Sequence, residues 1–244
     1  MKPILFLGAK SDIAKTTAEL YAKKGYNLYL AGRQVNTELI GFSRKLTEKY
    51  GCNVELFELD ILSFETHKLF FESLPYKPEG VLCFIGYLGN QKESELDFKE
   101  SRKIIDTNFT GIISLLNIFA NYFEDKKGGF IVGVSSVAGD RGRKSNYTYG
   151  SAKAALSTYL SGLRNRLSES NVAILTIKPG YVKTKMTDNM NLPSLLTVSP
   201  KYVSKRIYDL QQRKAEECYL PGYWYLIMAL IKTIPETIFK RLRL

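Results

Sequence analysis

The stretch PILFLGAKSDIA, residues 3–14, decides the fold of this chain. It opens as a short apolar run, turns at Gly8 and leads into a helical pattern from Ala14 to Lys24. A strand, a glycine turn and a helix together form an arrangement that binds dinucleotides, because backbone amides and the helix N-terminus receive the pyrophosphate. Asp12 and Ala14 stand where the second and third glycines are usual, so this loop departs from a strict G-x-G-x-x-G. Taken alone, this motif is equally typical of any strand–turn–helix unit that binds no nucleotide.

The remaining chain continues the alternation of strand and helix. Strand-like runs separated by amphipathic segments lie at residues 3–8, 26–31, 53–59, 80–85, 129–135, 172–178 and 217–220. They predict an α/β fold of the Rossmann type, a doubly wound, seven-stranded parallel sheet with helices on both faces. A chain of 244 residues that is 45% hydrophobic can bury one large core. We therefore expect a single domain over residues 1–221 with a helical, apolar and basic extension at 222–244, and a loop at 187–200 over the active-site edge.

A second pattern links a strand to the helix that follows it. The apolar run FIVGVSS, residues 130–136, predicts a buried parallel strand that delivers Ser136 at its carboxyl end. Tyr149 and Lys153 are four positions apart, so they share one helix face. A nearby ammonium lowers the pKa of a phenol, which makes Tyr149 a proton donor to a carbonyl that Ser136 holds. With 16 tyrosines in a lysine-rich chain, Y-x-x-x-K alone is expected about once by chance.

Taken together, these segments resemble the short-chain dehydrogenase/reductase family over most of the chain. That family carries a glycine-rich first turn, an Asp after the third strand, an Asn before the catalytic strand, then Ser, Tyr and Lys, and a Pro-Gly pair. The residues that match in this order are Gly8 to Ala14, Asp60, Asn108, Ser136, Tyr149, Lys153, Pro179 and Gly180.

The resemblance implies a role for each catalytic residue. Tyr149 would donate the proton, and Lys153 would lower its pKa and bond the nicotinamide ribose. Ser136 would orient the carbonyl, and Asn108 would hold a water in the proton relay. These four residues are the predicted catalytic set of an NAD(P)-dependent oxidoreductase.

The resemblance also implies the contacts of a nicotinamide cofactor. Asp60 would touch the adenine and Thr184 would anchor the carboxamide. Phe84-Ile85-Gly86 stands where Asn-Ala-Gly is usual, so this part of the cofactor wall departs from the family pattern. Besides Tyr149 and Lys153, the expected cofactor contacts are Gly8, Lys10, Ser11, Asp12, Ile13, Arg33, Asp60, Ile61, Gly86, Pro179, Gly180, Val182 and Thr184.

The charge after the second strand selects between the two nicotinamide cofactors. An acid there bonds the ribose 2′-hydroxyl of NAD, whereas an arginine suits the 2′-phosphate of NADP. Here the strand ends in Gly32 and Arg33, and Lys10 adds a second cation in the glycine loop. We predict NADP(H) as the preferred cofactor, with NAD(H) as the alternative.

Cysteine and histidine usage argues against other site chemistry. Cys52, Cys83 and Cys218 are far apart and no metal-ligand spacing occurs, which predicts no metal and a reducing compartment. Cys83 is expected in the core, and the sole histidine, His67, is expected on a helix surface without a catalytic role. The first strand follows Met1 and Lys2 at once, so we expect no signal peptide and a cytoplasmic location.

The net charge of +11, from 35 basic and 24 acidic residues, favours anionic partners. Most cations are scattered, and Arg141, Arg143 and Lys144 cluster between Ser136 and Tyr149. No recognition helix or stacking-aromatic pattern is found, so nucleic acid is not an expected partner.

The carboxyl end is unusually apolar. Residues 219–231 are aromatic and then aliphatic, which is too short for a bilayer span of about 20 residues, and residues 238–244 read IFKRLRL. An interfacial helix pair with aromatic and basic anchors fits 222–244, as does a subunit interface of a homo-oligomer, where this family often packs such segments. Both interpretations remain open at this point.

The resemblance narrows at residues 135–147 and at the tail. Both stretches are similar to polyprenyl-phosphoryl 2-keto-pentose reductases, the decaprenylphosphoryl-2-keto-ribose type of arabinofuranose donor synthesis. This implies a reductase of a lipid-phosphate-linked keto-sugar in cell-envelope synthesis, working at the inner face of the cytoplasmic membrane, with cations near the pocket mouth. The alternatives are a soluble reductase of a small ketone or 3-ketoacyl substrate, and a non-catalytic NADP-sensing protein. The intact catalytic set argues against the last.

Overall fold

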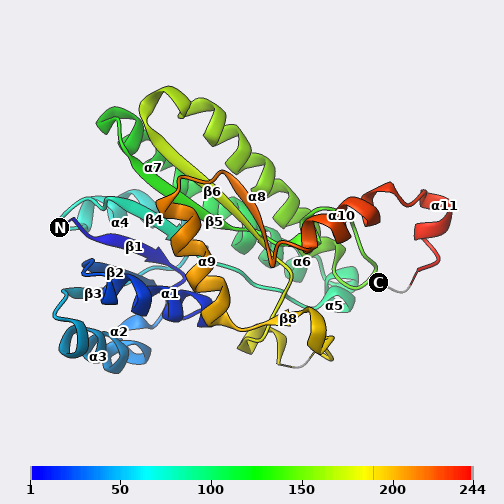
Figure 1. Ribbon diagram of the computed structural model, residues 1–244, viewed down its shortest axis with the longest axis horizontal. Helices are drawn as coiled ribbons and strands as arrows, with labels where there is room; N and C mark the ends of the chain where they lie inside the picture. Colours follow the sequence, from blue (N-terminus) through cyan, green and yellow to red (C-terminus); the bar gives the residue numbers. More distant parts are fainter. Residues whose placement is uncertain (1, 189, 243–244) are drawn as a thin grey trace.

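The computed structural model describes residues 2–188 and 190–242. Its centre is a seven-stranded sheet in the order β3-β2-β1-β4-β5-β6-β9, and every neighbouring pair runs parallel (Figure 1). The strands are β1 (Ile4–Leu7), β2 (Leu28–Gly32), β3 (Val54–Glu58), β4 (Gly80–Cys83), β5 (Gly129–Val134), β6 (Val172–Pro179) and β9 (Glu217–Leu220). This is the predicted doubly wound sheet, with strand ends within two residues of those expected.

Helices cover both faces of the sheet. One face packs against α1 (Asp12–Lys23), α3 (Ile40–Tyr50) and α9 (Pro200–Gln212). The other packs against α4 (His67–Ser73), α7 (Gly111–Lys126) and α8 (Tyr147–Arg166). The remaining α-helices are α2 (Val35–Glu38), α5 (Gln91–Leu96), α6 (Phe98–Ile105), α10 (Trp224–Thr233) and α11 (Glu236–Phe239).

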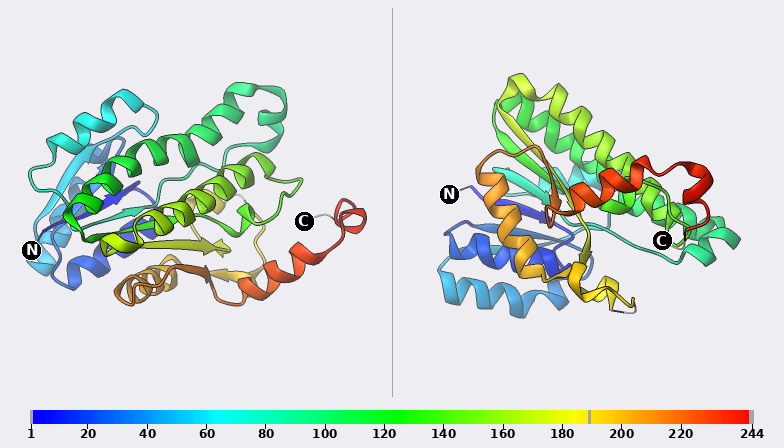
Figure 2. Two further views of the ribbon diagram at one scale, coloured as in Figure 1. Left: turned by 90° about the horizontal axis from the view of Figure 1, so that it is seen from above. Right: turned by 45° about the vertical axis from the view of Figure 1, so that its right-hand side comes forward.

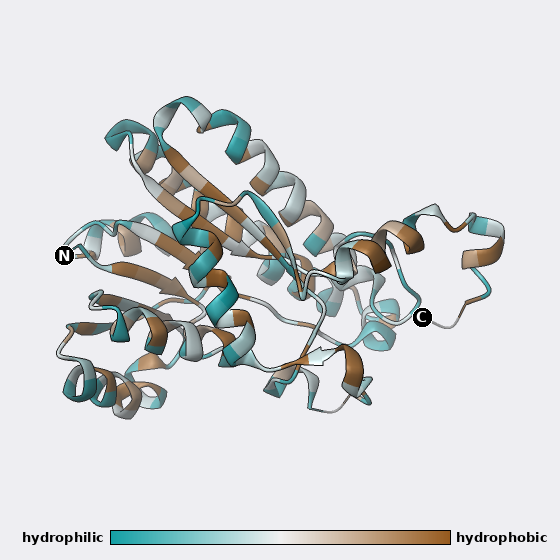
Figure 3. Cartoon of the chain, in the orientation of Figure 1, coloured by the Kyte–Doolittle hydropathy of each residue, from teal (hydrophilic) through white to brown (hydrophobic). Residues whose placement is uncertain are grey.

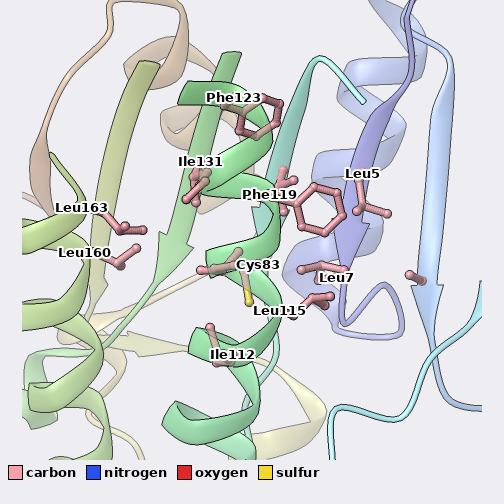
Figure 4. Packing of buried hydrophobic residues seen from close by; sticks show 14 of the residues in the cluster. Leu5, Leu7, Cys83, Ile112, Leu115, Phe119, Phe123, Ile131, Leu160 and Leu163 are labelled. Carbon is pink, nitrogen blue, oxygen red and sulfur yellow. The ribbon is translucent and has the colours of Figure 1, made fainter. Parts of the chain in front are cut away.

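Alternating side chains along each strand build the two core layers. In β1, Leu5 and Leu7 join the cluster with α7 and α8, whereas Ile4 and Phe6 join the cluster with α1 and α9. Figure 4 shows Leu5 and Leu7 packed with Phe119 of α7. Because both faces are covered, the central strands β1, β4 and β5 are apolar throughout, and Figure 3 shows hydrophobic bands through the centre of the molecule.

The order of the strands reverses between β1 and β4, which places the functional edge. The chain builds outward from β1 through β2 to β3, then returns to β4 on the other side of β1. At such a switch point the loops leave the carboxyl ends of adjacent strands in opposite directions, so a crevice opens between them.

The segment predicted as a loop at 187–200 contains more structure than expected. Its strand β8 (Thr197–Val198) pairs in parallel with β7 (Tyr181–Val182), and a 3₁₀ turn occupies Ser194–Leu196. Strands of two residues carry no periodicity that a sequence could reveal. The short pair ties this segment to the end of β6.

His67 corrects one prediction. We expected it on a helix surface, but its side chain is 1% exposed at the start of α4, and its Nδ1 is 2.9 Å from Ser114 Oγ on α7. The seven-residue α4 is too short for its apolar pattern to show which face is buried. Cys83 lies in the core as predicted, with 1% exposure.

The carboxyl-terminal segment forms the two helices α10 and α11, which lead away from the sheet (Figures 1 and 2). Trp224 and Met228, one turn apart, are buried with Val137 and Tyr219. Arg243 and Leu244 lie outside the described residues. Within the described part of the chain, no helix has the length and apolar character needed to cross a membrane.

Arg141 holds these two helices in place. Its guanidinium donates to the carbonyls of Ile231 and Ile234, pairs with Glu236 at 3.0 Å, and lies 3.7 Å from the ring centroid of Phe239. The neighbouring Asp140 carboxylate accepts from Lys178 and Tyr219 at the sheet edge. The chain between Ser136 and Tyr149 therefore anchors the carboxyl terminus.

Candidate active site

A cavity of about 510 Å³ opens at the carboxyl ends of the central strands. It is lined from the turn after β1, the loops after β4 and β5, helix α8, and the segment that follows β6. Every site residue predicted from the sequence lines this cavity except Asn108. The tertiary structure therefore brings together groups separated by up to about three-quarters of the chain.

The turn after β1 forms a cradle for a diphosphate. Gly8 has φ +76°, and a Cβ there would lie 2.8 Å from the backbone nitrogen of Ile85, so only glycine fits. The first amides of α1 have no partner within the helix and face this turn, which suits an anion. Asp12, in place of the second glycine, accepts a 2.8 Å hydrogen bond from the backbone of Lys185 and so ties this turn to the segment after β7.

The end of the cavity next to β2 carries a positive charge. Arg33 is exposed directly after β2 and no acid follows it in Gly32-Arg33-Gln34. Glu58, at the end of the neighbouring β3, accepts from the backbone of Gln34 and Asn36 instead. Lys10 also lines the cavity, but its Nζ is 2.6 Å from Glu38, so its charge is offset. The residues present fit a nucleotide with a 2′-phosphate beside Arg33.

Ser136, Tyr149 and Lys153 meet at the other end of the cavity. Ser136 follows β5 in extended backbone, and its Oγ accepts from Ala138 N at 3.1 Å. Tyr149 and Lys153 lie one turn apart on α8, with Lys153 Nζ 5.8 Å from the Tyr149 ring centroid. The ammonium donates to the carbonyl oxygens of Val134 at 3.1 Å and Ile85 at 3.4 Å.

Burial governs the protonation of this pair. It raises the pKa of Tyr149 to about 12, although a hydrogen bond with Ser136 lowers it, and it lowers the pKa of Lys153 to about 8. We expected Lys153 to lower the pKa of the Tyr149 phenol; desolvation, the larger effect, raises it instead. Tyr149 therefore stays protonated at neutral pH, as a proton donor must.

Asn108 lies behind the cavity. It is fully buried in a π-helical turn, Asp106–Thr110, between α6 and α7. Its Nδ2 donates to the carbonyls of Tyr87 and Ile104, and its Oδ1 accepts from Tyr87 N at 3.1 Å. These bonds hold the loop after β4 against the cavity, and the water-holding role inferred from the resemblance stays a prediction.

The carboxyl-terminal helix packs directly behind the Pro179-Gly180 pair. A Cβ on Gly180 would lie 1.9 Å from Trp224 Nε1, so a glycine is required for α10 to approach. The Trp224 ring also meets Tyr181 edge-on, with 5.4 Å between centroids. Tyr181 lines the cavity, which makes α10 a supporting wall of the site.

The three cations of residues 141–144 lie in different environments. Only Arg143 lines the cavity, whereas Arg141 binds α10 and α11, and Lys144 is exposed. Of the cations expected near the pocket mouth, Arg143 is therefore the one that meets the cavity, and a position at its mouth stays a prediction. Sequence reasoning missed Asn146 as a lining residue, although it stands immediately before α8 and three positions ahead of Tyr149.

Fold and site together define the class of protein. The sequence profile described as short chain dehydrogenase matches residues 2–194, and the chain belongs to this family of oxidoreductases. An uncharacterized oxidoreductase of Mycobacterium tuberculosis is 30% identical over 244 residues, covering 98% of this chain and 96% of the relative. An NADP-dependent 3-hydroxy acid dehydrogenase of Schizosaccharomyces pombe is 30% identical over 191 residues, 76% of this chain and 73% of the relative. A short-chain dehydrogenase from Sphingobium yanoikuyae in complex with NADPH superposes with a TM-score of 0.82 at 20% identity, covering 97% of both chains.

The buried ammonium predicts a pH-dependent stability. The pKa of Lys153 is about 8 in the folded protein against 10.5 in the unfolded chain, so the unfolded chain binds more protons between these values and stability rises with pH there. Relative to Lys153→Met, the wild type should gain up to about 3 kcal/mol in free energy of unfolding as pH rises from 7 to 10. Urea unfolding of both proteins without nucleotide measures this difference.

The range from pH 7 to 10 lies below the pKa of the Tyr149 phenol. Its pKa is raised from 10.0 to about 12, so its own contribution to stability declines only above pH 10. A Lys144→Met variant, which removes an exposed lysine outside the cavity, is the control for the loss of a lysine side chain. A constant difference between wild type and Lys153→Met across the range would contradict the assignment.

Proposed function

We propose that this protein is an NADPH-dependent reductase of a ketone, and that its substrate is a keto-sugar linked to a polyprenyl phosphate in cell-envelope polysaccharide synthesis. The observation that carries the reductase proposal is the convergence of Ser136, Tyr149 and Lys153 on one cavity that also holds the glycine cradle. The proposed NADPH supplies a hydride to the carbonyl carbon when bound. The chain's own residues position the ketone and supply the proton.

The protonation states support reduction. A phenol kept protonated by burial can donate to the carbonyl oxygen as charge develops there, and the Ser136 hydroxyl can hydrogen-bond the same oxygen. Lys153, held by two backbone carbonyls, lies beside the ring and can stabilise the phenolate that forms. Asn108 holds the cavity-lining Tyr87 through two hydrogen bonds to its backbone.

Tyr149→Phe should lower kcat by about 10²- to 10⁴-fold, because the ring remains while the proton donor is lost. NADPH affinity, measured by the quenching of protein fluorescence, should change less than about threefold. The substrate panel contains a polyprenyl-phosphoryl keto-pentose, small ketones and a 3-ketoacyl thioester. The matched control is Tyr147→Phe, an exposed tyrosine two residues away whose hydroxyl bonds Glu95.

The panel also separates the competing activities. Retained turnover in Tyr149→Phe would refute the catalytic assignment. A preference for the 3-ketoacyl thioester would favour the soluble reductase, the candidate supported by the name of the Schizosaccharomyces relative. Absence of NADPH oxidation with every ketone would favour the non-catalytic NADP-sensing alternative.

Arg33 supports NADPH over NADH. It is an exposed cation directly after β2, on the cavity wall, and its sequence neighbours Gly32 and Gln34 offer no acid to bond a ribose 2′-hydroxyl. Arg33→Ala should lower kcat/KM for NADPH by about 10- to 100-fold, the value of a charge-assisted hydrogen bond, and leave kcat/KM for NADH nearly unchanged. Steady-state kinetics with both cofactors measures the ratio. If kcat/KM is equal for NADPH and NADH in the wild type and does not change in Arg33→Ala, the predicted preference is wrong.

The outer face of α10 supports peripheral contact with a membrane. Tyr225, Leu226 and Leu230 are 62 to 70% exposed on the side opposite Trp224 and Met228. Lys232 follows them and is exposed. An apolar face with basic neighbours suits the boundary of an anionic bilayer, and it adjoins the wall of the cavity where a lipid-linked substrate would enter. We propose that residues 222–244 serve this role as part of the same domain as residues 1–221.

A double variant tests the membrane contact. Leu226→Ser with Leu230→Ser should reduce binding to vesicles of phosphatidylglycerol and phosphatidylethanolamine at least tenfold, because each side chain contributes on the order of 1 kcal/mol or more when buried. Flotation measures the bound fraction. The control is Leu96→Ser, a 91% exposed leucine on α5.

The same variant examines the subunit-interface alternative. If this face is buried between two copies, the double variant should change the oligomeric mass measured by light scattering and leave vesicle binding unchanged. That result would contradict the membrane proposal. The expected homo-oligomer itself remains a prediction.

A further inference from the structure

An acidic side chain stands in the glycine cradle of the cavity. Asp12 occupies the position where the second glycine is usual, and it is the first residue of α1. Its carboxylate repels a diphosphate, because both groups are negative and both are attracted to the same helix N-terminus. The acid therefore suits this position only when a contact elsewhere offsets its charge.

The Asp12 carboxylate binds the backbone of a segment far along the chain. Its Oδ2 accepts a 2.8 Å hydrogen bond from the backbone nitrogen of Lys185, 173 residues away. Lys185 begins the 3₁₀ turn Lys185–Thr187, which follows β7. Thr184 and Thr187 close this turn with a reciprocal capping box, so the hydrogen bond from Lys185 to Asp12 holds the turn as a unit.

From this fixed backbone, the side chain of Lys185 extends along the cavity wall. Lys185 lines the cavity, whereas Lys183, two residues earlier, does not. The pKa of the Glu38 carboxyl on α2 is held below its usual value by its hydrogen bond to Lys10 first, and also by the charge of Lys185. Such an effect places the Lys185 ammonium near Glu38, and hence near the glycine turn that carries Lys10.

The Lys185 ammonium is available to a ligand. Lys10 Nζ is 2.6 Å from Glu38, which offsets its charge, but in the part of the chain that the structure describes Lys185 forms no ion pair. Its side chain is exposed on the cavity wall, so a ligand oxygen can reach it. An ammonium held beside an anion cradle, without a carboxylate partner, can donate a charge-assisted hydrogen bond to a phosphate oxygen.

We propose that Asp12 and Lys185 form a clasp over the nicotinamide dinucleotide: Lys185 binds a diphosphate oxygen, and Asp12 is a positioning residue that holds the Lys185 backbone for this contact. The acid in the glycine turn and the lysine that offsets its charge thus act as one unit. This inference rests on the proposed function, because it needs a bound dinucleotide, and it adds a cofactor contact from the segment that follows β7.

Calorimetric titration of the full chain with NADPH and with NADH tests the contact of Lys185. Lys185→Gln should weaken both dinucleotides by the same factor, about 3- to 10-fold, because the two share the diphosphate. Arg33→Ala should instead weaken NADPH alone, because only NADPH carries the 2′-phosphate. Lys185→Arg should restore part of the affinity, and the effect of Lys185→Gln should shrink in 1 M NaCl, which screens an exposed charge.

Matched variants isolate the positioning role of Asp12. Asp12→Ala and Asp12→Asn both remove its charge, but asparagine keeps an acceptor for the Lys185 N–H. Asp12→Ala should therefore bind NADPH about threefold more weakly than Asp12→Asn, and this difference should vanish when Lys185→Gln is also present. Lys183→Gln makes the same change of charge on an exposed lysine outside the cavity and should leave both affinities unchanged. Thermal unfolding of each variant verifies its fold.

The outcomes separate this inference from the proposed function. Wild-type affinity for both dinucleotides in Lys185→Gln, or equal affinity in Asp12→Ala and Asp12→Asn, would overturn the clasp. A loss confined to NADPH in Lys185→Gln would place the ammonium at the 2′-phosphate and would also overturn it. Dinucleotide binding that depends on Lys185, in a protein that oxidises no NADPH with any ketone, would support the clasp and contradict the reductase. A wild type that binds neither dinucleotide would contradict both.

Discussion

The buried ammonium of Lys153 organises the reactive end of this molecule. An isolated charge in a protein interior costs several kcal/mol, so Lys153 must find acceptors. It finds them in the carbonyls of Val134 and Ile85, where β5 and β4 end. Ser135 adds a hydrogen bond to the Lys153 carbonyl at 2.9 Å. These contacts fix α8 against the sheet edge, and Tyr149, one turn earlier, consequently faces the cavity.

The chain between Ser136 and Tyr149 connects the site to the carboxyl terminus. Asp140 binds the sheet edge, Arg141 binds α10 and α11, and Arg143 reaches both the cavity and Met228. Helix α10 therefore has two distinct faces. One supports the cavity wall, and the other exposes apolar side chains. The proposed substrate has a sugar phosphate head and a lipid tail. Its head would enter the cavity that one face of α10 supports, and its tail would stay in the membrane that the other face is proposed to contact.

Local patterns of apolar residues predicted most of the fold, and the resemblance to the family supplied the site residues. Strands β1, β4 and β5 are continuous apolar runs, whereas Ser136, Tyr149 and Lys153 were singled out because they stand in the order typical of the family. The pKa of Tyr149 could not be predicted from its spacing to Lys153, because desolvation depends on every segment that covers the ring. The burial of His67 depends on Ser114 of α7, and the strand β8 is too short to leave a pattern.

The sequence by itself determined the parallel sheet, the glycine turn and the order of the chemical groups, because each depends on residues that are neighbours along the chain. Only the tertiary structure decided which cation of the 141–144 cluster faces the cavity, which side of α10 stays exposed, and that Asn146 lines the site. Arg141 and its partners on α10 and α11 are about 90 residues apart, as the separations of its hydrogen bonds show. Contacts over such separations arise from packing in three dimensions, which no local periodicity encodes.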